Sequence, residues 1–108
     1  MRGPFVLTKY CVDMVVPPKR LGVYALSNDR DSIDIIRRAE KSTGDEIKGF
    51  FQQYKYFWVA VAYSQQDAFR IQCEQYHRRM AGGDNTIGWE HPKAPKQSGW
   101  HCPVCDCH

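Results

Sequence analysis

The most restrictive part of the sequence is the run from Tyr56 to Tyr63, YFWVAVAY, which is almost wholly apolar. A run of this length, rich in β-branched and aromatic residues, is typical of a strand whose two faces are both covered. Helix-forming patterns lie on both sides of it along the chain. The run therefore predicts the central strand of a sheet with helices packed against it.

The helix-forming pattern before this strand begins at Thr43. Thr43 and Glu46 have the spacing of a capping box, in which a hydroxyl and a carboxylate satisfy free backbone N–H groups at a helix start. Four large apolar residues follow at the spacing of one helical face: Ile47, Phe50, Phe51 and Tyr54. We expect an amphipathic helix here.

A second capping box, formed by Ser64 and Asp67, follows the apolar strand. It predicts a helix over residues 65–80, which Gly82-Gly83 would end. One face of this helix carries a cysteine among large side chains: Phe69, Cys73, Tyr76 and Met80.

The first 40 residues favour strands. Residues 5–16 are rich in β-branched and aromatic side chains and predict one strand that ends at Pro17-Pro18. Residues 21–26 and 32–36 predict two more, joined by a turn at 28–31. Strands and helices mix without regular alternation, so the expected class is α+β. We expect residues 1–80 to form this domain and residues 81–108 to form an irregular tail packed on it.

Composition narrows the class of protein further. The chain has 108 residues, a length that fits one domain, and its net charge of +3 permits an anionic partner without requiring one. No stretch reaches the roughly 20 apolar residues of a membrane span, and Lys9 and Asp13 interrupt the apolar start. We therefore expect a cytoplasmic protein with no membrane association. Five cysteines, an odd number, favour metal binding over a disulfide framework.

The end of the chain, HCPVCDCH, concentrates three cysteines and two histidines in eight residues. Cys102 and Cys105 have the spacing of half a zinc shell. Cys73 and His77 are four residues apart, so they share one face of the predicted helix. Together these four residues predict a structural Zn²⁺ site that pins the tail to the helix.

Other interpretations of the tail stay open. Cys73 could be a small hydrophobic core residue, with no metal bound at all. Cys102 and Cys105 also have the spacing of a disulfide oxidoreductase motif, although such motifs stand at a helix start. Several further residues are substitutes for the helical ligand pair: His91, His101, Cys107 and His108.

The order of motifs resembles the GIY-YIG nuclease superfamily over residues 20–88. Gly22-Val23-Tyr24 opens a strand, and DAFRIQCEQYHRR, DN, HP and the closing WHCPVC are similar to small bacterial members with a Cys-pair tail. The resemblance implies a small antiparallel sheet flanked by helices. It also implies phosphodiester cleavage assisted by two tyrosines, an arginine and a divalent ion bound by a helical glutamate.

Only some of the family's functional residues have a match in this sequence. Tyr24 and Arg38 match the first tyrosine and the arginine, while Ile35 stands where the second tyrosine belongs. The helical glutamate becomes Gln72, and a neutral amide is a poor Mg²⁺ ligand. Asn85 matches an asparagine near the helix end. The resemblance therefore implies a domain that has lost cleavage, with Mg²⁺ expected only if an active nuclease remains.

Three functions follow from these observations. The first is a zinc-stabilised domain that binds DNA or RNA without cutting it. Its expected contacts are Arg37, Arg38, Lys41, Arg70 and Asn85. The second is an active endonuclease in which another carboxylate, Asp34 or Glu46, holds the metal. The third is a protein-interaction module marked by exposed aromatic residues, for which the sequence offers four candidates: Phe50, Phe51, Phe57 and Trp58.

Overall fold

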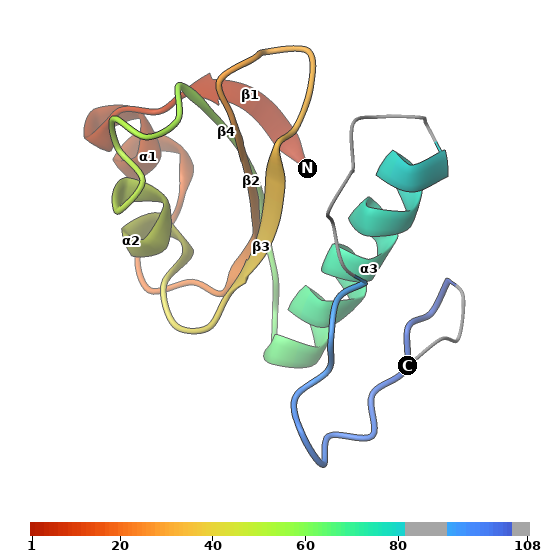
Figure 1. Ribbon diagram of the computed structural model, residues 1–108. Helices are drawn as coiled ribbons and strands as arrows, with labels where there is room; N and C mark the ends of the chain where they lie inside the picture. Colours follow the sequence, from red (N-terminus) through yellow and green to blue (C-terminus); the bar gives the residue numbers. More distant parts are fainter. Residues whose placement is uncertain (82–90, 105–108) are drawn as a thin grey trace.

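The computed structural model describes residues 1–81 and 91–104 of the chain. Four strands form one antiparallel sheet in the order β1-β4-β2-β3. Figure 1 shows α1 and α2 on one face of this sheet and α3 on the other. The fold is therefore α+β, as the sequence predicts. The elements are β1 (Arg2–Val6), α1 (Lys9–Val15), β2 (Gly22–Ser27), β3 (Ile35–Ala39), α2 (Thr43–Lys48), β4 (Tyr56–Val61) and α3 (Gln65–Ala81).

The sheet separates two apolar cores because successive side chains of a strand point to opposite faces. Tyr24, Leu26 and Phe57 pack with α1 and α2 in the larger core. Val23 lies on the other face and packs with Ala68 of α3. Every residue of β2 is buried, and Phe57, Trp58 and Val59 of β4 are buried as well. The prediction of a strand covered on both faces is confirmed for β4.

The single strand expected over residues 5–16 is wrong. The chain turns after β1, and α1 follows with Thr8 as its N-cap, whose hydroxyl accepts a hydrogen bond from the Cys11 N–H at 3.1 Å. Val12 and Val16 are four residues apart and both are buried against the core, a helical spacing. Packing of this face outweighed the strand propensity of its β-branched residues.

Two boundaries also differ from the expectation. The second strand of the hairpin is β3 at 35–39 and not 32–36, so the turn is longer. The capping box at Thr43 is wrong, because Ser42 is the N-cap and makes no side-chain cap hydrogen bond. The Thr43 hydroxyl instead donates to the Arg20 carbonyl at 2.8 Å. Helix α2 ends at Lys48, before the predicted apolar face is complete.

The second capping box is present at the start of α3. The Asp67 N–H donates to Ser64 Oγ at 3.0 Å, and Asp67 Oδ2 accepts from the Tyr63 N–H at 3.0 Å. Helix α3 then runs over Gln65–Ala81, close to the predicted 65–80. Gly82-Gly83, expected to end it, lies outside the described residues. No helix within 1–81 or 91–104 is long and apolar enough to cross a membrane.

Asp67 makes the start of α3 sensitive to pH. The Tyr63 N–H and the Arg70 guanidinium hold the pKa of the Asp67 carboxyl below its usual value. Its stabilising effect is therefore complete above the unfolded pKa of about 3.9 and is lost as pH falls through the lower folded pKa. We expect Asp67→Asn to cost about 1 kcal/mol near neutral pH and less in acid. Urea denaturation at both pH values measures this, and an equal cost at both would contradict it.

Candidate metal centre and the adjoining cleft

Two buried cysteines meet beside α3. Cys73 lies in the middle of α3, and Cys102 comes from the tail, which runs along the helix (Figure 1). With His91 they form a group in which one ligand atom from each residue lies within 4.8 Å of the others. This group can hold a metal ion. Phe69 and Trp100 cover the two thiols, with their ring centroids 6.2 Å apart.

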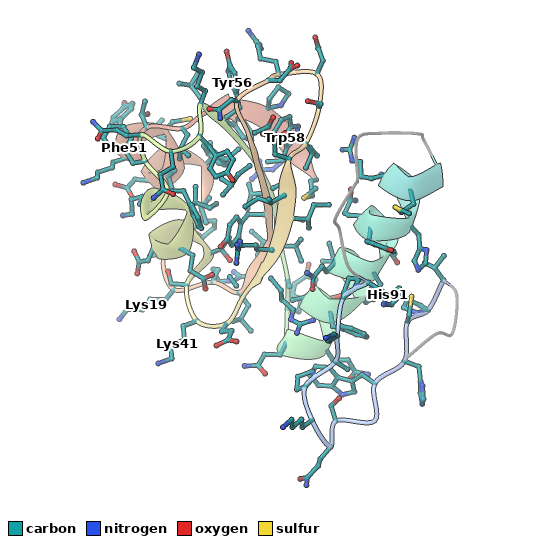
Figure 2. The ribbon with its side chains drawn as sticks, viewed as in Figure 1. Lys19, Lys41, Phe51, Tyr56, Trp58 and His91 are labelled. Atoms are coloured by element: carbon teal, nitrogen blue, oxygen red, sulfur yellow. The ribbon has the colours of Figure 1, made fainter. Side chains whose placement is uncertain are left out.

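His91 is oriented by its own neighbour in the chain. Its Nδ1 lies 2.8 Å from the Pro92 carbonyl oxygen, which only accepts hydrogen bonds. The neutral ring therefore carries its proton on Nδ1 and keeps a lone pair on Nε2, where a metal would bind. His91 Nε2 also lies 3.2 Å from Nε2 of His77. Figure 2 shows His91 beside α3.

The four predicted ligands do not all come together in the structure. Cys73 and Cys102 come together, as their placement on the helix and tail led us to expect. His77 is in contact with the group through His91, one of the substitutes considered from the sequence. Cys105 lies outside the described residues, as do Cys107 and His108. His101 is exposed and is not part of the group.

A cleft of about 760 Å³ adjoins this centre along the outer edge of β3. Strand β3 contributes Arg37 and Arg38, α2 contributes Glu46, and α3 contributes Gln72. The tail closes the cleft with His91, Pro92 and Lys93. His91 therefore belongs to both the metal centre and the cleft wall.

Tyr24 and Arg38, the two catalytic candidates, lie on opposite faces of the sheet. Tyr24 pairs in register with Arg37, and Val23 with Arg38, so Tyr24 and Arg37 share the face covered by α2. Arg38 points toward α3. Both Tyr24 and Arg38 line the cleft, but they reach it from the two sides of β3.

Arg38 connects the strand, the helix and the tail. Its guanidinium donates to Gln72 Oε1 at 3.1 Å and to the Lys93 carbonyl at 2.9 Å, and it lies 5.3 Å from the centroid of the Phe69 ring. Burial lowers the pKa of Arg38, but arginine remains cationic at neutral pH. Both hydrogen-bond acceptors are neutral, so neither offsets the positive charge.

Tyr24 is held by a carboxylate on the α2 side of the cleft. Its hydroxyl donates to Glu46 Oε1 at 3.1 Å, and Glu46 Oε2 accepts from the Glu40 N–H at 3.0 Å. Burial and the negative charge of Glu46 raise the pKa of Tyr24 well above its usual value. The phenol therefore stays protonated at neutral pH and acts as a hydrogen-bond donor.

The predicted nucleic-acid contacts are spread over the molecule. Arg37 is exposed and lies 5.7 Å from the Phe50 ring centroid. Lys41 is exposed on the loop between β3 and α2 (Figure 2). Arg70 lies on α3 and pairs with both Asp67 and Glu74, which offset its charge. Asn85 lies outside the described residues.

Lys93 is a cleft residue that the sequence analysis missed. It stands in an irregular segment, where no periodicity relates it to β3. Only the hydrogen bond from Arg38 to its carbonyl shows that this part of the tail reaches the strand. The neighbouring His91-Pro92 was part of the family resemblance, and His91 was also a substitute metal ligand, so both signals pointed to this segment but not to Lys93.

No protein-family model, curated protein or solved structure matches the chain. The resemblance to the GIY-YIG superfamily therefore stays a prediction from the order of motifs.

Proposed function

We propose that the chain is a GIY-YIG-like domain that binds nucleic acid in the β3 cleft, does not cut it, and is stabilised by a structural zinc ion. The observation that carries the proposal is the set of cations around one cleft: Arg37, Arg38 and Lys93. A volume of about 760 Å³ falls in the usual range for sites that take small organic ligands. A nucleotide unit is smaller than this and would fit.

The cleft offers the groups that nucleic acids require. Guanidinium groups bind phosphate oxygens through paired N–H donors. Tyr76 adds aromatic surface at the cleft wall, whereas the Tyr24 ring is buried and its hydroxyl already donates to Glu46. Aromatic faces stack on bases regardless of sequence. The combination favours backbone-directed binding with little base specificity.

The absence of cleavage follows from Gln72. Its Oε1 accepts from Arg38, so the position where the family has its metal-binding glutamate holds a neutral amide engaged by a cation. Mg²⁺ binds through carboxylate and water oxygens, and this pairing offers it no carboxylate.

One observation favours the nuclease alternative. Glu40 and Glu46 line the same cleft as Tyr24, so carboxylates are near the expected phosphate position. Both oxygens of Glu46 already accept hydrogen bonds, from Tyr24 and from the Glu40 backbone. A divalent ion would have to compete with these bonds, and we rank cleavage second for this reason.

The interaction-module alternative has less support from the described residues. Two of its four candidate aromatic residues, Phe57 and Trp58, are buried, and Phe50 is half-buried. Phe51 alone of the four is exposed, near Lys9 of α1.

Zinc is the proposed metal because of the donor set. Two thiolates and an imidazole are ligands that Zn²⁺ prefers, whereas Mg²⁺ and Ca²⁺ prefer oxygen. The cysteines are buried and covered by aromatic rings, a setting typical of closed structural sites. The ion would join α3 to two points of the tail.

A gel-shift series tests nucleic-acid binding. Zinc-loaded protein is incubated with single-stranded, duplex and branched DNA and with RNA, at several salt concentrations with Mg²⁺ or Mn²⁺. We expect a shift that weakens with salt, because phosphate contacts release counterions, and no cuts on denaturing gels. Metal-dependent cuts would establish the nuclease alternative. No shift with any probe would contradict the proposal and favour a protein partner.

Arg37→Gln is the matched variant for this assay. We expect it to weaken binding about tenfold and to reduce the salt slope by about one. Arg30→Gln is the control, because Arg30 is also exposed and also lies 5.7 Å from an aromatic centroid, that of Tyr56, but outside the cleft. Equal losses in both variants would show that net charge alone binds the nucleic acid.

A further inference from the structure

The Nε2 atoms of His77 and His91 have the spacing of two ligands of one ion, although among the described residues the group whose ligand atoms all lie within 4.8 Å of one another is Cys73, His91 and Cys102. Zinc binds histidine nitrogen at about 2.0–2.1 Å in a tetrahedral shell, so two such nitrogens stand roughly 3.3 Å apart by that geometry. Their Nε2 atoms are 3.2 Å apart. Cys73 and His77 are also four residues apart on α3, which places both side chains on the same face.

We infer that His77 is the fourth ligand and that the centre is a closed Cys₂His₂ site formed by Cys73, His77, His91 and Cys102. Cys105, the second cysteine of the tail pair, is not needed. The inference rests on the metal-binding part of the proposed function and does not depend on nucleic-acid binding.

The proton arrangement around the two histidines fits this assignment. The Pro92 carbonyl keeps the proton of a neutral His91 on Nδ1, so the short Nε2–Nε2 contact without metal requires an N–H from His77. A bound ion would take the Nε2 lone pairs of both rings, so His77 would then carry its proton on Nδ1. The two thiols release one proton each as they become thiolates.

Charge and covering also favour this set. Two thiolates and two neutral imidazoles around Zn²⁺ give a centre with no net charge, whereas three thiolates would leave one negative charge in a buried site. The Tyr76 ring contacts both imidazoles, with centroids 5.1 Å from His77 and 5.2 Å from His91. Aromatic rings therefore flank all four proposed ligands, with the two cysteines buried and the two histidines half-buried, His91 at the cleft.

Titration of the metal-free full chain with Co²⁺ tests the assignment. Tetrahedral Co²⁺ gives visible absorption bands, and the intensity of its sulfur charge-transfer band counts the thiolates. We expect a two-thiolate spectrum for the wild type and for Cys105→Ser, with equal affinity. His77→Ala should lose at least 100-fold in affinity, since even residues that only orient ligands cost about 10- to 100-fold.

His77→Cys keeps the test valid if His77→Ala folds poorly. A thiolate at position 77 should retain the ion and raise the spectrum to three thiolates. His101→Ala is the control, because His101 is exposed and outside the group, and it should match the wild type. Loss of affinity in Cys105→Ser with none in His77→Ala would overturn the inference. A wild type that binds neither Co²⁺ nor Zn²⁺ would overturn the metal centre as a whole, and the gel shifts report separately on nucleic acid.

Discussion

Removing the proposed zinc ion should lower the Tm of the chain by roughly 15 °C or more. A ligand that binds only the folded state at about 1,000 times its Kd adds about 4 kcal/mol. In a domain of this size 1 kcal/mol corresponds to about 4–8 °C. The effect is large because residues 91–104 form no helix or strand, and the proposed ligands His91 and Cys102 would fix them to α3. Calorimetry with and without a chelator measures the difference.

Cysteine variants separate this effect from a general role of thiols. Cys102→Ser should have the same lowered Tm that we expect for the wild type with chelator, and adding chelator should not change the Tm of this variant further. Cys11→Ser is the control, since Cys11 is half-buried on α1 and packs against the other core. It should keep the full response to zinc. A Tm that does not change with chelator in the wild type would contradict the structural role of the metal.

Gly22→Ala should strongly destabilise the sheet. A Cβ at this position would overlap the Ala60 carbonyl oxygen and lie 2.9 Å from the Thr43 hydroxyl. Both are fixed, because Ala60 belongs to β4 and Thr43 donates to the Arg20 carbonyl. We expect a loss of about 3 kcal/mol, at the upper end for overpacked cores, measured as a lower midpoint of urea denaturation.

Gly44→Ala provides the comparison. A Cβ there would meet Val12 and Val16 at 3.6 Å, an ordinary contact distance. Gly44 lies inside α2, where alanine is favoured over glycine by about 1 kcal/mol. The variant should be as stable as the wild type or more so. Equal losses at both positions would show that Gly22 is not specially constrained.

The sequence predicted an element correctly where its pattern was long or where two independent patterns agreed. The apolar run became β4, and the Ser64–Asp67 box together with the helical face gave α3 nearly to the residue. Residues 9–15 were predicted as part of a strand but form a helix, because the β-branched Val12 and Val16 have a strand propensity and also a helical spacing. Only the tertiary contact with the α2 side of the sheet decides between these signals.

The candidate site was predictable where ligands sit on a regular element. Cys73 and His77 could be placed together because a helix has a fixed period. His91 could not be placed, since its approach depends on an irregular segment turning back toward α3. Arg37 and Arg38 were both expected to contact nucleic acid, but as neighbours in a strand they point to opposite faces. A strand assignment that started at Ile35 would have separated them.

The hydrogen bonds of Arg38 join the cleft to the candidate metal centre. Gln72 precedes Cys73 in the chain, and Lys93 follows His91 by two residues, so a single guanidinium holds the neighbours of two proposed ligands. An ion at the candidate centre and a phosphate at Arg38 would both order these two segments. Bound metal would then raise the affinity for phosphate, and bound phosphate would raise the affinity for metal by the same factor, because free-energy coupling between sites is reciprocal. The affinity of the cleft for phosphate would then depend on whether the metal site is occupied.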